Sequence, residues 1–162
     1  MRMEPVQAVI AARTLLADVT PLSGDCGRVC GGACCLPDED GQGGMLLFPG
    51  EETLYAPLPD GFHLTRTDAP LPGSLLLTCE GVCRRQDRPL SCRLFPLLPT
   101  EKGAELDRRG WAVCPLMDSG VRGLRREFVD AVKAAGRILY ACPQEARFLR
   151  ALHAYNERLR QF

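Results

Sequence analysis

The sequence lacks any long apolar run, and its 162 residues include only two histidines and one tryptophan. No stretch reaches the roughly 18 consecutive apolar residues that a membrane-spanning helix needs, so the chain is predicted not to span a membrane. Basic and acidic residues balance at 20 each, and neither nucleic acid nor an anionic membrane is therefore indicated as a partner. The length suits one domain.

Familiar catalytic motifs are also missing, because the sequence contains no GxSxG, P-loop or Rossmann glycine pattern. The glycines of residues 41–44 predict a flexible loop, since no strand leads directly into a helix there. Glu51 and Glu52 stand at an expected helix start, where acidic residues are usually capping charges. His63 is expected to be structural, with zinc ligation the less favoured alternative, and His153 is expected at a helix edge. These features favour a binding protein over an enzyme.

Cysteine is what the sequence has in excess. Eight of the nine cysteines fall into two groups, CxxxCxxxCC and CxxxCx₈C with one more cysteine further on. Polar residues interrupt residues 1–20, which therefore do not resemble a signal peptide, and a cytoplasmic location is expected. Thiols stay reduced in the cytoplasm, which favours metal or redox chemistry over disulfides. The candidate metal ligands are Cys26, Cys30, Cys34, Cys35, Cys79, Cys83, Cys92 and Cys114.

The spacing of these thiols suits metal ions, because tetrahedral zinc and iron–sulfur clusters both need thiolates that converge within a few Å. Eight thiols would satisfy two four-coordinate ions. Neighbouring side chains diverge along an extended chain, so Cys34 and Cys35 are expected to serve different ions, or to leave one reactive thiol. Disulfides and unligated or catalytic thiols are the less favoured alternatives. Cys142 lies outside both groups and is expected to be an unligated thiol near a helix start.

Four arginines crowd the second cysteine group. They would either donate hydrogen bonds to thiolate sulfurs and offset the charge of a metal centre, or form a solvated basic loop. For Arg84 and Arg85 the solvated loop is at least as well supported. Arg88 opens the sequence RPLSCRLFP, which Pro89 stiffens, and Arg93 follows Cys92 directly.

The segments CGRVCGGACC at residues 26–35 and CEGVCRRQDRPLSCRLFP at residues 79–96 resemble the YkgJ-type cysteine-cluster family, whose members are described as zinc- or iron-chelating. The most specific element is RPxxCRxFP at residues 88–96. Family members usually carry a longer insertion where this chain has only Glu80, Gly81 and Val82. The resemblance implies metal binding through the eight cysteines, and it implies no reaction.

The pattern predicts a mainly α fold with a small β-hairpin, in which helices pack around a loop-rich, cysteine-ligated metal region. A single domain over residues 1–162 is expected, with an N-terminal helix over 4–19, the cysteine region over 26–114 and C-terminal helices over 119–161. Asp118 or Ser119 would cap the first C-terminal helix and Gly136 would end it. Pro143 would begin the second.

Two smaller elements are predicted between the cysteine groups. Residues 49–55 should form a short helical turn, because a proline and two glutamates stand at its start. Residues 62–67 and 74–78 should pair as a hairpin across a turn rich in proline and glycine, which would place Cys79 at the end of the second strand.

Three functional classes stay open at this point. One is a binding module held together by zinc, another is an iron–sulfur or mononuclear-iron protein, and the third is a metal carrier with exchangeable thiolates. A closed four-thiolate site favours the first, because catalysis needs an open coordination position. Zinc is the expected ion, with iron or an iron–sulfur cluster as the alternative, and the sequence leaves open whether there is a protein partner.

Overall fold

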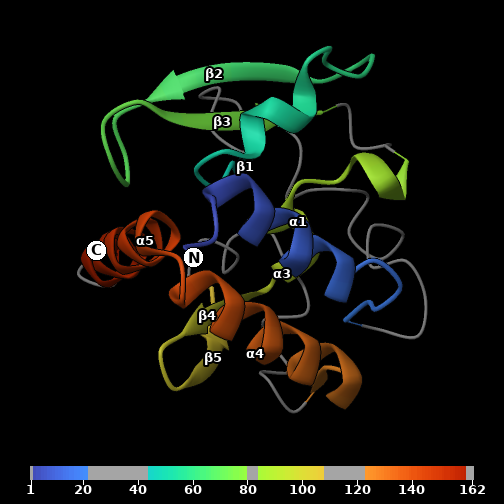
Figure 1. The fold of residues 1–162 in the computed structure, drawn as a ribbon, viewed down its shortest axis with the longest axis vertical. Coiled ribbons are helices and arrows are strands. Elements are labelled where there is room, and N and C mark those ends of the chain that lie inside the picture. The colour runs from blue at the N-terminus through green and yellow to red at the C-terminus, as the bar shows by residue number, and fades with distance from the viewer. Residues whose placement is uncertain (1, 22–43, 80–83, 108–122, 160–162) are drawn as a thin grey trace.

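The computed structural model describes residues 2–21, 44–79, 84–107 and 123–159. These residues form four α-helices, two short 3-10 helices and two small antiparallel sheets (Figure 1). The prediction of a mainly α fold with one hairpin is therefore wrong, and the fold is mixed. The additional strands are two to four residues long, too short to show the alternating pattern by which a strand is recognised.

The first sheet has the strand order β1 (Met45–Leu46), β3 (Ser74–Thr78) and β2 (His63–Thr67), and every pair is antiparallel. The hairpin of β2 and β3 confirms the expected pairing, with His63 opposite Thr78. Gly73 has a φ of 80° in the turn, a conformation that glycine adopts without strain. Cys79 follows β3 directly, as expected.

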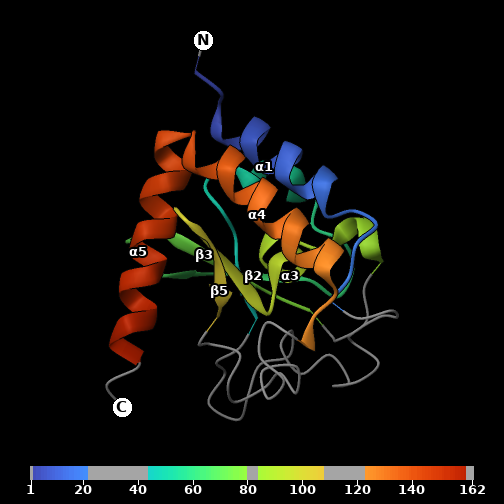
Figure 2. The ribbon, with the colours of Figure 1, turned by 90° about the horizontal axis from the view of Figure 1, so that it is seen from below.

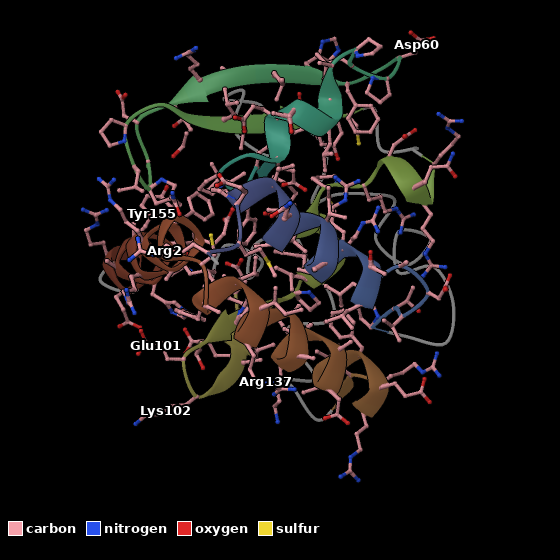
Figure 3. The ribbon with its side chains drawn as sticks, in the orientation of Figure 1. Arg2, Asp60, Glu101, Lys102, Arg137 and Tyr155 are labelled. Atoms are coloured by element: carbon pink, nitrogen blue, oxygen red, sulfur yellow. The ribbon has the colours of Figure 1, made fainter. Side chains whose placement is uncertain are left out.

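The second sheet pairs β4 (Leu97–Thr100) with β5 (Gly103–Leu106), and Pro99 lies opposite Ala104. A proline within a run argues against a strand, because it donates no ladder hydrogen bond, and this is why the sequence did not indicate β4. Both strands pack against α4 (Arg126–Tyr140). The glutamate and lysine of the intervening turn, Glu101 and Lys102, lie at the outer end of this sheet in Figure 3.

The core lies between the helices and the two sheets. Helix α1 (Pro5–Leu15) packs along α4, and α5 (Pro143–Leu159) covers one end of the pair (Figure 2). Phe128, Leu139, Leu149 and Leu152 are fully buried there. Burying each such side chain stabilises the fold by about 1.5–3 kcal/mol. Within the described residues, no helix has both the length and the apolar character needed to cross a membrane.

Helix boundaries follow the sequence only in part. The start of α5 at Pro143 is confirmed, and α1 begins near its expected position but ends at Leu15. Residues 118–122 lie outside the described part of the chain, and α4 begins at Arg126. The expected end at Gly136 is wrong, because α4 continues to Tyr140. Gly136 is buried against Pro99, so its small size serves packing and not helix termination.

Candidate metal site around Cys79 and Cys92

Two of the eight predicted ligands, Cys79 and Cys92, lie within the described residues. Both line one small cavity of about 10 Å³, together with side chains of the first sheet and Pro89. Cys79 reaches the cavity from the end of β3, whereas Cys92 reaches it from the middle of α3 (Leu90–Leu94). The fold thus brings two predicted ligands to a common space from different elements. The other six, Cys26, Cys30, Cys34, Cys35, Cys83 and Cys114, lie outside the described residues.

The sulfur of Cys79 lies in apolar surroundings. Cys79 is 8% exposed and belongs to a buried cluster with Tyr55, Phe62 and Leu77. His63 is exposed and directly opposite Thr78, so its side chain is on the other face of the sheet from Cys79. His63 is therefore not among the residues that line the cavity.

Helix α3, which carries Cys92, has only five residues and no side-chain cap of its own. So short a helix is not stable alone, and its contacts with other segments must hold it. The carboxylate of Glu51 accepts a hydrogen bond from the first N–H of this helix, with 2.7 Å between Oε2 and the Leu90 nitrogen. The hydroxyl of Ser91 donates to the carbonyl of Leu46 in β1. These contacts attach α3 to β1 and to the segment that follows β1.

Glu51 belongs to the 3-10 helix η1 (Glu51–Tyr55), which confirms the predicted short turn. Glu51 and Glu52 both stand in the first turn of η1, at the expected helix start, but Glu52 is exposed whereas Glu51 is 0% exposed. Burial raises the pKa of Glu51, and the backbone N–H groups of Leu90 and Phe48 and the Arg13 guanidinium counteract that rise. Nothing in the sequence spacing links Glu51 with α3, so sequence reasoning missed this residue.

The arginines near Cys92 differ in their surroundings. Arg84 is 71% exposed and pairs with Asp87 at 3.0 Å, as the solvated loop requires. Arg93 instead donates to the carbonyls of Arg88 at 2.9 Å and Arg13 at 3.2 Å, so it fixes the course of the backbone. Arg85, Arg88 and Arg93 also line a hollow of about 20 Å³ beside Cys92. Their positive charge would offset that of a thiolate.

Tyr55, the last residue of η1, connects η1 to the 3-10 helix η2 (Arg85–Asp87). Its hydroxyl donates to the carbonyl of Asp87 at 2.7 Å. Burial raises the pKa of Tyr55, and the nearby charges of Glu51 and Cys92 add to that rise. The hydroxyl therefore stays protonated and keeps its donor role at neutral pH.

Cys142 and His153 do not line the cavity. Cys142 is fully buried in the helical core, with its sulfur 3.5 Å from the Met3 carbonyl oxygen and no disulfide. His153 joins α5 to the second sheet: Nε2 lies 2.9 Å from the Pro99 carbonyl and Nδ1 lies 2.9 Å from a Glu105 carboxylate oxygen. Both residues have structural surroundings.

The described side chains supply part of a ligand set. Two soft sulfur donors line one largely apolar cavity, and arginines line a second hollow beside Cys92; these surroundings fit a thiolate metal site. Within residues 2–21, 44–79, 84–107 and 123–159, no three His, Cys, Asp or Glu side chains gather as potential ligands. Any complete site must therefore draw on cysteines outside these ranges.

No protein-family model, no curated protein and no solved structure matches this chain. The resemblance to the YkgJ-type family stays a prediction from the two cysteine segments.

Proposed function

We propose that the protein binds metal through its two cysteine groups and that zinc is the ion. The single observation that carries the proposal is the cavity shared by Cys79 and Cys92, which come from a strand end and a helix. Ordinary buried cysteines are scattered through a core, whereas ligands must converge. The expected ligands are Cys26, Cys30, Cys34, Cys35, Cys79, Cys83, Cys92 and Cys114.

The surroundings of the two sulfurs favour a structural site over a catalytic one. Phe62 and Leu77 shield Cys79 from water, and Arg93 holds the backbone beside Cys92 in a fixed course. A bound zinc ion would contribute binding free energy to folding by joining the cysteine-bearing segments. The protein would then be a binding module with its segments held together by metal.

Metal analysis of reduced protein, purified from its native host under anaerobic conditions, tests this function. We expect colourless protein that contains two zinc ions per chain. A brown chromophore with labile sulfide would show an iron–sulfur protein instead, and metal that a chelator removes without unfolding would show a carrier. Protein that takes up no metal in any of these forms would overturn the proposal.

Replacing Cys92 by serine should lower metal content and thermal stability together, because a hydroxyl is a much poorer ligand for zinc than a thiolate. The matched control is Cys142→Ala, which removes a buried thiol away from the cavity and should leave stoichiometry unchanged. Elemental analysis and a thermal melt measure both effects. Unchanged stoichiometry in Cys92→Ser would remove Cys92 from the ligand set.

Metal retention should also depend on pH, because thiolates must lose their protons to bind and protons compete with the ion. We expect metal loss to steepen as the pH falls from neutral to mildly acid values. Dialysis at a series of pH values followed by metal analysis measures the occupancy. A flat occupancy over this range would contradict a thiolate site.

A further inference from the structure

The carboxylate of Glu51 joins three segments of the chain at one buried point. Its Oε1 accepts from the Phe48 N–H at 3.1 Å, and its Oε2 accepts from the Leu90 N–H at 2.7 Å. The Arg13 guanidinium of α1 lies 3.3 Å from the same Oε2. A buried carboxylate with donors on both oxygens is a rigid junction, because moving any one segment leaves a charge or an N–H unpaired.

This junction supplies what α3 cannot supply for itself. The residue before the helix is Pro89, whose side chain has no acceptor for the first N–H groups. Glu51 provides that acceptor from a distant part of the sequence, and its negative charge also suits the helix N-terminus. Cys92 lies two residues after Leu90, whose N–H donates to Glu51. The junction therefore fixes the helical turn that carries the Cys92 sulfur.

The same junction is connected to Cys79 through the first sheet. Phe48 follows β1 closely, and β1 pairs with β3 in a register that places Met45 opposite Leu77. Cys79 stands two residues beyond Leu77, and Ser91 of α3 donates to Leu46 of β1. A short path of hydrogen bonds therefore runs from the helix of Cys92 to the strand of Cys79.

We propose that Glu51 is a positioning residue for the thiol pair: it holds Cys92 at the cavity that Cys79 lines, without touching either sulfur. The inference rests on the proposed function, since it concerns the geometry of the same site. A positioning role differs from general stabilisation, because it predicts a change at Cys92 that exceeds the change elsewhere in the protein.

Glu51→Gln tests the proposal in the full-length protein. Glutamine keeps the shape of the side chain. Its amide N–H₂ group, however, must replace one carboxylate oxygen, so a donor now faces a donor where the oxygen accepted a hydrogen bond. We expect affinity for cobalt(II), added as a spectroscopic probe, to fall about 10-fold, the lower end of the effects seen when groups supporting metal ligands are removed. In the metal-free protein, alkylation of Cys92 should become several-fold faster relative to Cys142, as read by peptide mass spectrometry.

Glu52→Gln is the matched control, because it makes the same chemical change at the next residue, which is exposed. It should leave cobalt affinity and the ratio of alkylation rates at their wild-type values. Cys142 reports on global opening, since it is fully buried in the main core cluster and does not line the cavity. Equal acceleration at Cys92 and Cys142, or a Glu51→Gln protein that matches Glu52→Gln in both measurements, would overturn the positioning role.

A second variant covers the case in which Glu51→Gln does not fold. Glu51→Asp keeps the negative charge but shortens the side chain, so one carboxylate can no longer reach both the Phe48 and the Leu90 N–H groups, and it should raise the same ratio of alkylation rates. An unchanged ratio in that variant would also overturn the proposal. If the wild-type protein binds no metal while the Cys92 ratio responds to Glu51→Gln, the proposed function fails and the positioning role stands.

Discussion

The wild-type protein is expected to lose stability steeply as the pH rises from about 5 to about 9, and replacing Glu145 by glutamine is expected to abolish that loss. Glu145 lies in the first turn of α5 and is 0% exposed, and neither carboxyl oxygen has a hydrogen-bond partner in the described structure. Burial, followed by the nearby charges of Glu51 and Glu52, raises its pKa to about 9. The folded protein therefore holds a proton that the unfolded chain releases near pH 4.5.

The sign of the effect follows from proton linkage. Because the folded pKa exceeds the unfolded one, the native state binds more protons between these values, and stability falls as the pH rises through that range. Each pH unit removes about 1.4 kcal/mol from the free energy of unfolding. Glutamine cannot ionise, so the advantage of Glu145→Gln over the wild type should be about 3 kcal/mol greater at pH 8 than at pH 6.

Urea unfolding at a series of pH values measures this difference, and subtracting the two curves cancels the titration of the cysteines. The control is Glu127→Gln, since Glu127 stands in the first turn of α4 as Glu145 does in α5, but its side chain is 70% exposed. Its curve should run parallel to that of the wild type. Parallel curves for Glu145→Gln would show that Glu145 is ionised in the folded protein.

Glu145 and Glu51 are both buried carboxyl groups, but the fold gives them different hydrogen-bonding surroundings. Phe148, one turn further along α5, packs on Phe48 with 4.9 Å between ring centroids, so the two glutamates lie near one junction of the core. Glu51 meets two N–H groups and a guanidinium, whereas Glu145 meets none in the described structure. A proton on Glu145 avoids a second negative charge beside Glu51, and so protects the junction that holds α3.

The sequence predicted the elements whose signals are local. The hairpin of β2 and β3 follows from β-branched and apolar residues around a turn of prolines and glycine, and the start of α5 follows from Pro143 at the first helical position. The 3-10 helix η1 likewise follows from its proline, glycine and glutamates. These features need no information about distant residues.

The features that sequence did not reveal depend on contacts between distant segments. The strand β4 contains a proline, and only its pairing with β5 identifies it as a strand. Nothing in the sequence distinguishes Glu51 from Glu52, and only the fold shows that Glu51 accepts a hydrogen bond from α3. Among the predicted ligands, the grouping of cysteines indicated metal, but only the fold brings Cys79 and Cys92 to one cavity. Metal binding stays a prediction from spacing along the chain, whereas the architecture depends on contacts that spacing does not show.

Replacing Gly136 by alanine should destabilise the protein by about 1–2 kcal/mol, and by valine more, since overfilling a packed core costs about 1–3 kcal/mol. A glycine at an exposed helix position would show the opposite sign, because alanine favours the helix by about 1 kcal/mol. A Cβ atom at position 136 would lie 2.8 Å from Cβ of Pro99. Pro99 cannot move away easily, because its carbonyl oxygen accepts hydrogen bonds from Nε2 of His153 at 2.9 Å and from the Tyr140 hydroxyl at 3.4 Å.

The neighbouring residue provides the control for this sign. Arg137, labelled beside α4 in Figure 3, is exposed, and Arg137→Ala should change stability by less than about 0.5 kcal/mol. Urea unfolding at one pH compares the variants. A Gly136→Ala protein more stable than the wild type would mean that α4 does not pack closely against β4 at this point. Loss of stability there would instead show that the second sheet is held by close contact between a helical glycine and a strand proline, a contact that neither residue type suggests alone.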